Sequence, residues 1–167
     1  INGMIHKIFM LAKNEKVQID DNIYKCNVAM MLKQDIVEFE GVAARENRKF
    51  NVDIPDTQLF SEVNVENLKD AFDNILMNAI KYSTDNSVIN ITATENGDAV
   101  MLAFSNETEC MTNADCERIF DKFYRADPAR NSRVSGNGLG LSIVKDTVEA
   151  CGGKVWAEYD NNKFCLY

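Results

Sequence analysis

The stretch "SVINITATENGDAVMLAFSN" (residues 87–106) carries two strand-like runs on either side of Asn96-Gly97. An Asn-Gly pair between two such runs favours a tight β-hairpin. The C-terminal stretch "KVWAEYDNNKFCLY" (154–167) has the same pattern across Asn161-Asn162. These two hairpins predict antiparallel strand pairs, which the architecture of the chain has to accommodate.

Helical patterns alternate with the strands along the chain. The strongest covers residues 64–82, with apolar side chains at helical spacing: Val65, Leu68, Phe72, Ile75, Leu76 and Ala79. Further elements are expected as helices over 28–45, 113–120 and 139–150, the last ended by Gly152-Gly153, and as strands over 49–55 and 57–63. Together they predict an α/β sandwich, with about three helices on one face of a single mixed, mostly antiparallel sheet.

The composition indicates a folded protein and excludes several classes. The chain has 167 residues and a net charge of −8, which argues against a general nucleic-acid surface, because backbone binding needs a basic footprint. No apolar run approaches the roughly 20 residues needed to cross a bilayer. The five cysteines are irregularly spaced and only one histidine accompanies them, which favours incidental reduced thiols over a disulfide framework or a zinc site.

The N-terminal segment differs from the rest. Residues 1–13 place Ile1, Met4, Ile5, Ile8 and Phe9 on one helical face, which we expect to pack on a partner element. Residues 14–27 are expected to be a connector and 28–167 one domain. Because the first residue is not Met, the chain is expected to be a piece of a longer protein.

A polar face runs along the strongest helix in "NILMNAIKYS" (74–83). Asn74, Asn78 and Lys81 are spaced by four and three residues, so they share one side, and Tyr82 lies beside them. An amide oxygen can ligate Mg²⁺, and an ammonium group can neutralise phosphate. A solvated polar face is the alternative, and spacing alone favours it.

Three glycines precede and begin the helix in "GNGLGLSIVKD" (136–146). Gly136, Gly138 and Gly140 leave room for an anion to approach the unpaired N–H groups of a helix N-terminus, although a flexible turn has the same composition. A dinucleotide-binding fingerprint needs a strand directly before the glycines, and a Walker loop needs Gly-Lys-Ser/Thr, so neither fits.

Between these segments lies "RIFDKFYRADPARNSR" (118–133), which is rich in cations and aromatic residues. It contains Arg118, Phe120, Lys122, Phe123, Tyr124, Arg125, Arg130 and Arg133. In a chain of net charge −8, this local excess of cations indicates an anionic ligand. A solvated charged loop would explain the charges, but it explains the aromatic residues less well.

In this order, the three segments resemble the N, F and G2 boxes of the catalytic and ATP-binding domain of sensor histidine kinases. The resemblance covers about residues 28–167, and residues 1–13 resemble the end of the family's dimerisation and phosphotransfer helix. It implies an α/β sandwich with a long lid over ATP. It also implies the following roles: Asn78 as the Mg²⁺ ligand, Asn74 on the phosphate side, Lys81 and Tyr82 on phosphates or ribose, Arg125 toward the γ-phosphate, Phe120 and Phe123 as lid anchors, and Gly136, Gly138, Leu139, Gly140 and Leu141 as the nucleotide loop.

One segment departs from the family pattern. Members of the family usually carry Asp-x-Gly-x-Gly before the F box, and the matching positions here are Asn106, Thr108 and Cys110. The amide oxygen of Asn106 can accept from an adenine amino group, but it lacks the charge of a carboxylate. We therefore expect a weaker or altered adenine contact. The alternative function is a nucleotide-sensing or protein-binding module without kinase activity.

The resemblance implies a reaction and partners. Lys81 and Arg125 would assist transfer of the ATP γ-phosphate to a histidine on a phosphotransfer helix, for relay to a response regulator. His6 is not that acceptor, because "HKIFML" lacks the acidic residue that follows it in the family. The parent is expected to be a homodimeric, membrane-anchored bacterial sensor with this part in the cytoplasm, and the fragment a monomer.

The same resemblance predicts negligible ATP hydrolysis. Related ATPases place a Glu where Asn74 stands, and an amide cannot act as a general base. Asp73 is adjacent in sequence, but it is expected to point about 100° away around the helix.

Overall fold

Five strands form a mixed sheet in the order β2, β4, β5, β7, β6 in the computed structural model, which describes residues 22–109, 111–126 and 137–167. The β2–β4 pair is parallel and the other pairs are antiparallel. The strands are β2 (Lys49–Asp53), β4 (Val88–Asn96), β5 (Ala99–Glu107), β6 (Ala157–Asp160) and β7 (Lys163–Leu166). The predicted mixed, mostly antiparallel sheet is confirmed.

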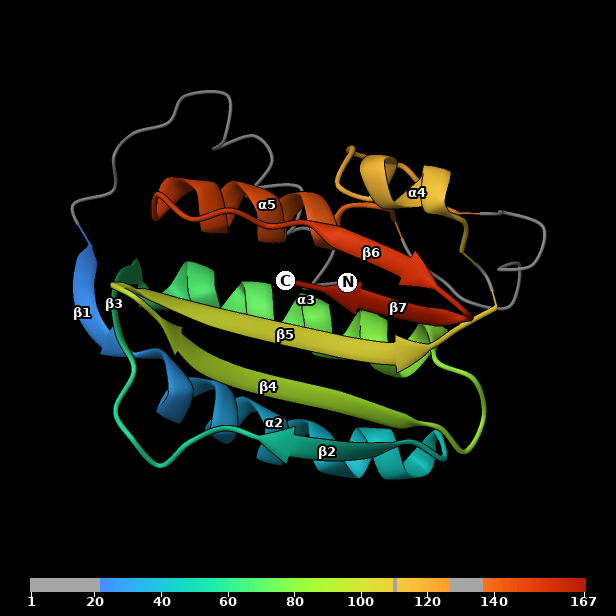
Figure 1. Ribbon diagram of the computed structural model, residues 1–167, viewed down its shortest axis with the longest axis horizontal. Coiled ribbons are helices and arrows are strands. Elements are labelled where there is room, and N and C mark those ends of the chain that lie inside the picture. The colour runs from blue at the N-terminus through green and yellow to red at the C-terminus, as the bar shows by residue number, and fades with distance from the viewer. Residues whose placement is uncertain (1–21, 110, 127–136) are drawn as a thin grey trace.

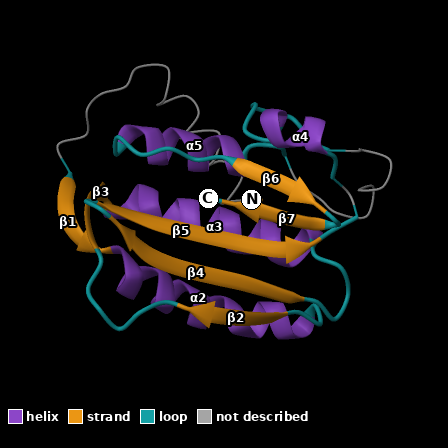
Figure 2. Ribbon diagram, viewed as in Figure 1, coloured by secondary structure: helices purple, strands orange, loops and turns teal. Residues whose placement is uncertain are grey.

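Three long helices cover one face of this sheet (Figures 1 and 2). They are α2 (Val28–Arg45), α3 (Val65–Tyr82) and α5 (Gly140–Ala150), and the short α4 (Asn113–Arg118) packs beside β6. The core lies between helices and sheet, and its fully buried side chains include Leu32, Phe72, Leu76, Ile80, Ile89, Ile91 and Val144. The predicted α/β sandwich is therefore confirmed.

Short polar residues fix where the long helices begin. The side chains of Asn27 and Asn64 accept from the N–H groups of Met30 and Asn67, at 3.2 and 3.0 Å, and so cap α2 and α3. At the end of α5, Gly152 has φ +73° and Gly153 donates to the Val148 carbonyl at 3.0 Å. This is the glycine cap that the sequence predicts.

A second, two-stranded sheet differs from the expected single sheet. β1 (Ile23–Asn27) pairs antiparallel with β3 (Phe60–Asn64), so β3 does not join the main sheet. The prediction of one sheet was wrong because the partner of a strand depends on contacts between distant segments, which local patterns do not encode. The first residues of this ribbon belong to the segment expected as a connector.

The two hairpins agree with the sequence to different degrees. In the β6–β7 turn, Asn161 and Asn162 have φ +48° and +62°, and they form the predicted two-residue loop. In the β4–β5 turn, Asn96 pairs with Ala99, so the loop residues are Gly97 and Asp98. The predicted turn was therefore one residue too early, because Gly97 takes the positive φ at the first loop position.

Some expectations concern residues outside the described part of the chain. The helix over 1–13, most of the connector, Cys110 and residues 127–136, with Arg130, Arg133 and Gly136, lie there. In the described ranges, no helix is both long and apolar enough to cross a membrane. The same ranges contain no group of His, Cys, Asp and Glu side chains suited to holding a metal ion.

Candidate functional site

The polar face of α3 opens into a cavity of about 540 Å³. Asn74, Asn78, Lys81 and Tyr82 all line it, because their helical spacing brings them to one side while Phe72, Leu76 and Ile80 face the core. The Asn74 amide donates to the Asp70 carbonyl at 2.7 Å, which turns its oxygen away from that end of the helix. The alternative of a solvated polar face does not describe this arrangement.

The N-terminus of α5 forms the opposite wall. Gly138, Leu139, Gly140 and Leu141 line the cavity, and no side chain caps the first N–H groups of this helix. A Cβ atom at Gly140 would lie 3.1 Å from the Asn74 oxygen and 3.4 Å from the Asn78 nitrogen. A glycine at this position therefore lets the helix N-terminus approach both amides, and an anion bound between them would meet N–H donors.

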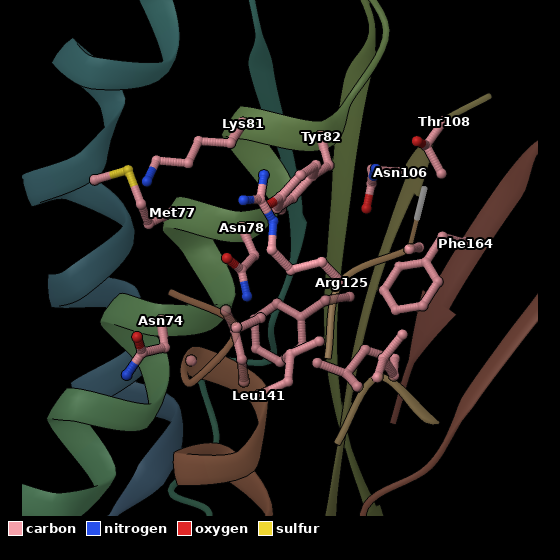
Figure 3. A pocket seen from close by; sticks show the side chains of 18 of the residues that line it. Asn74, Met77, Asn78, Lys81, Tyr82, Asn106, Thr108, Arg125, Leu141 and Phe164 are labelled. Carbon is pink, nitrogen blue, oxygen red and sulfur yellow. The ribbon is translucent and has the colours of Figure 1, made fainter. Parts of the chain in front are cut away.

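The other end of the cavity is mostly apolar. Figure 3 shows Asn106, Thr108 and Phe164 together at this end, away from Asn74. On the paired strands β5 and β7 that carry Asn106, the apolar side chains that line the cavity are Phe104, Phe164 and Leu166. The cavity thus has an apolar compartment with two buried polar side chains, and this compartment is joined to one rich in cations and amides. The apolar compartment suits a flat ring, and the other suits an anionic group of the same ligand.

Arg125 reaches the cavity from the segment after α4, and in Figure 3 its side chain points toward Asn78 and Tyr82. Phe120 and Phe123 do not line the cavity. Phe120 is partly buried against the core, and Phe123 is 70% exposed with φ +67°. Neither side chain belongs to the cavity wall, so the role of Phe120 and Phe123 as anchors of a lid over the nucleotide stays a prediction.

The base of this segment is held by polar contacts near α4. The Tyr124 hydroxyl donates to the Asp115 carboxylate, which raises the pKa of Tyr124, and the Arg118 guanidinium lies 4.4 Å from the Tyr124 ring centroid. The Asp115 carboxylate also accepts from the N–H of Thr112 at 2.7 Å as part of a capping box. The residue before Arg125 is thus fixed to a helix of the sandwich.

Asp73 also lines the cavity, although its position one residue before Asn74 predicted that it points elsewhere. The cavity extends around more than one face of α3. It therefore includes Asp73 and Met77 as well as the face that carries Asn74, Asn78 and Lys81. Burial raises the pKa of the Asp73 carboxyl, against the effect of the Lys69 ammonium 3.5 Å away.

Lys69 connects Asp73 to α2. Its Nζ atom lies 2.7 Å from Asp35 and 3.2 Å from Glu38, and the hydrogen bond to Asp35 raises the pKa of Lys69. Asp35 is only 3% exposed, so the Lys69 ammonium is its compensating charge inside the protein. This cluster joins α2 and α3 behind the cavity wall.

Sequence reasoning missed several lining residues. Thr108 was noted only as a departure from a family pattern, and Met77, Phe104, Met111 and Phe164 were not singled out. The period of two along β5 places Phe104 beside Asn106 on the same face, so this pair could have been inferred. Phe164 could not, because it reaches the site through the β5–β7 pairing.

A family of known proteins matches this arrangement. Residues 63–165 match the family described as "Histidine kinase-, DNA gyrase B-, and HSP90-like ATPase". The matched range covers more than half of the chain and includes α3, β4, β5 and α5.

Two curated relatives are named as sensor proteins, one of them as a sensor histidine kinase. Sensor histidine kinase WalK of Bacillus subtilis (strain 168) is 29% identical over 157 residues, which make up 93% of this chain and 26% of WalK. Sensor protein VanS of Enterococcus faecium is 45% identical over 97 residues, which make up 58% of this chain and 25% of VanS. The chain thus spans about a quarter of the length of either relative.

Solved structures have the same fold. The catalytic domain of histidine kinase ThkA matches with a TM-score of 0.74 and 26% identity, covering 86% of this chain and 91% of that one. ThkA in complex with the response regulator protein TrrA matches with a TM-score of 0.72 and 20% identity, covering 99% of this chain and 47% of that one. At this lower identity the likeness concerns the fold alone.

Proposed function

Because the chain belongs to the histidine kinase-, DNA gyrase B- and HSP90-like ATPase family, we propose that it is the ATP-binding catalytic part of a sensor histidine kinase. Its reaction is transfer of the ATP γ-phosphate to a histidine on a phosphotransfer helix, for relay to a response regulator. The observation that carries this proposal is the cavity in which the Asn74–Lys81 face of α3 meets the N-terminus of α5. The relative WalK is named as a sensor histidine kinase, so a nucleotide-sensing module without kinase activity is not favoured.

The two compartments of the cavity suit the two ends of ATP. The apolar end, with Phe104, Phe164 and Leu166, accommodates the base, and Asn106 offers an amide oxygen to its amino group. Lys81 and Arg125 line the end that would take the phosphates. Phosphoryl transfer relies on positioning and charge neutralisation, so these two cations are the groups we assign to catalysis.

The residues present also fit a magnesium ion. Gly140 keeps the space beside the Asn74 and Asn78 amides open where a Cβ atom would fill it, and amide oxygens are hard ligands that Mg²⁺ accepts. Asn78 would hold the ion, which when bound supplies positive charge to the phosphate oxygens. Asn74 would lie on the phosphate side, with its amide nitrogen held by the Asp70 carbonyl.

Hydrolysis of ATP by this chain is expected to be negligible. Asn74 has no basic group, and the Asp73 carboxylate is paired with Lys69, which Asp35 holds in turn. A coupled assay of ADP release should therefore give a rate close to that without protein. Rapid release that the Asp73→Asn variant abolishes would show instead that Asp73 acts as a general base.

The partners and setting follow from the same proposal. The chain would act on a phosphotransfer helical domain, of which residues 1–13 are a remnant, with 14–27 as connector and 28–167 as the ATP-binding domain. The parent would be a homodimeric, membrane-anchored bacterial sensor with this part in the cytoplasm. The fragment itself would be a monomer and would not phosphorylate itself.

Calorimetric titration with Mg-ADP and a non-hydrolysable ATP analogue tests nucleotide binding. We expect micromolar dissociation constants, which the Asn78→Ala variant weakens strongly when Mg²⁺ is present. Asn51→Ala is the matched control, because Asn51 is exposed on β2 and outside the cavity. Absence of binding at millimolar nucleotide would refute the proposal.

Kinase activity requires a second test. The chain, joined to phosphotransfer helices, should transfer radiolabelled γ-phosphate to a histidine, and Lys81→Met should slow that transfer more than it weakens binding. If the chain binds nucleotide but transfers no phosphate to the histidine, it is a nucleotide-binding domain and the assignment as a kinase is refuted.

A further inference from the structure

The end of β5 places two buried polar side chains in the apolar compartment of the cavity. Asn106 and Thr108 both line it, and Thr108 is only 1% exposed. Their neighbours Phe104, Phe164 and Leu166 offer no hydrogen bonds from their side chains. In such a compartment, the few polar groups decide how a ligand is oriented and which ligand is preferred.

The amide of Asn106 has a defined orientation. Its nitrogen donates to the Glu107 carbonyl at 3.4 Å, and the same carbonyl accepts from the N–H of Thr84 at 2.9 Å, just beyond the end of α3. The amide oxygen therefore remains as the acceptor for a bound base. A neutral acceptor that faces position 6 distinguishes a 6-amino group, which donates, from a 6-oxo group, which only accepts.

The β6–β7 hairpin holds Thr108 at both of its backbone polar groups. The Thr108 N–H donates to the Asn162 carbonyl at 2.8 Å, and the Thr108 carbonyl lies 3.0 Å from the Tyr159 hydroxyl, which donates to it. Tyr159 lies outside the cavity lining, and its hydroxyl is also 3.2 Å from the Asn162 side-chain oxygen. A residue 51 positions away in sequence thus fixes the backbone next to the apolar compartment.

We propose that Tyr159 is a positioning residue for base recognition: through Thr108 it holds the end of β5 so that the Asn106 oxygen faces the 6-amino group of the purine. This inference rests on the proposed function, because it concerns the base of the bound nucleotide. The contacts of Tyr159 and Asn162 hold the backbone of Thr108 in place, whereas a glycine-rich segment at this position would be more flexible. The chain then selects adenine through geometry and without a carboxylate.

The test compares ADP with inosine diphosphate, which carries a 6-oxo group in place of the 6-amino group. Calorimetry on the full 167-residue chain measures both dissociation constants for the wild type, Tyr159→Phe and Tyr24→Phe. Tyr24 is a matched control, because it is exposed on β1 and does not line the cavity. Thermal unfolding of each variant checks that it is folded.

The wild type should bind ADP about fivefold more tightly than inosine diphosphate, as one neutral hydrogen bond allows. In Tyr159→Phe this preference should fall to less than about twofold while the affinity for inosine diphosphate stays unchanged. Tyr24→Phe should retain the wild-type preference. If Tyr159 had a purely structural role, Tyr159→Phe would lower the affinity for both nucleotides equally, and this result would overturn the inference.

A second variant keeps the inference testable if Tyr159→Phe does not fold. Asn106→Ala withdraws the acceptor and leaves the contacts of Tyr159 in place, so the preference for ADP should be lost. A wild-type preference in Asn106→Ala would overturn the inference. If the wild type binds ADP but has no preference, the inference alone fails; if it binds neither nucleotide, the proposed function fails with it.

Discussion

The backbone N–H of Phe123 donates to the carbonyl of Gly138 at 2.8 Å, and so joins the two ends of the segment between α4 and α5. Gly138 has φ +66°, and a Cβ atom there would lie 2.7 Å from the Phe123 carbonyl carbon. Phe123 itself has φ +67°. Two residues with left-handed backbones thus lie in direct contact beside the cavity, which Gly138 lines, and only Gly138 is a glycine.

Gly138→Ala should lower both the free energy of unfolding and the affinity for Mg-ADP. The left-handed backbone disfavours alanine by about 1 kcal/mol. The contact with Phe123 adds to this and displaces the start of α5, so we expect at least a tenfold loss of affinity by calorimetry.

Gly97→Ala is the matched control for this variant. Gly97 has φ +64° but no atom within 4 Å of an added Cβ, and it lies in the β4–β5 turn. Gly97→Ala should lower the free energy of unfolding only because alanine disfavours the left-handed backbone, and it should bind Mg-ADP like the wild type. Equal nucleotide affinity in both variants would contradict a role for the Phe123–Gly138 contact.

Gly140→Ala should weaken nucleotide binding without lowering stability. Alanine favours the helical backbone of α5, but its Cβ would press on the amides of Asn74 and Asn78 at 3.1 and 3.4 Å. We expect the affinity for Mg-ADP to fall about fivefold to tenfold, since displacements well below 1 Å in a binding site have effects of this order. Gly41→Ala in α2, where nothing lies within 4 Å, should raise stability and leave affinity unchanged.

Lys69→Met should destabilise the fold more than Lys33→Met. Removing Lys69 leaves the buried Asp35 carboxylate without its counter-charge, which we expect to cost about 2–3 kcal/mol, the lower end for a buried pair because Lys69 itself is partly exposed. Lys33 pairs with the fully exposed Asp56, so its removal should have little effect. Urea unfolding of both variants gives the comparison.

Stability should also decline at alkaline pH through Lys69. The contact with Asp35 raises the pKa of Lys69 above its usual 10.5, so the folded state retains this proton after the unfolded chain has lost it. The contribution is therefore fully present below pH 10.5 and is lost as the pH rises further. Unfolding free energies of the wild type should approach those of Lys69→Met only as the pH rises above 10.5, whereas a constant difference there would exclude this linkage.

The sequence located most of the site because its strongest signals are local. Asn74, Asn78, Lys81 and Tyr82 share a helix face by spacing alone, and Gly138 to Leu141 lie at the start of a helix that glycines and apolar periodicity both predict. Each of these groups lies within a few residues of the chain, so helical geometry alone brings its members to one side.

The sequence by itself determined the two hairpins, the long helices and the face of α3 that lines the cavity, because each depends on the conformation of neighbouring residues. The tertiary structure alone decided that β3 pairs with β1, that Gly140 lies beside Asn74, that Asp73 shares the cavity and that Tyr159 supports Thr108. These contacts join residues far apart in the chain or depend on the width of the cavity. They form only when the packed core brings whole elements together, and no local pattern records which elements will meet.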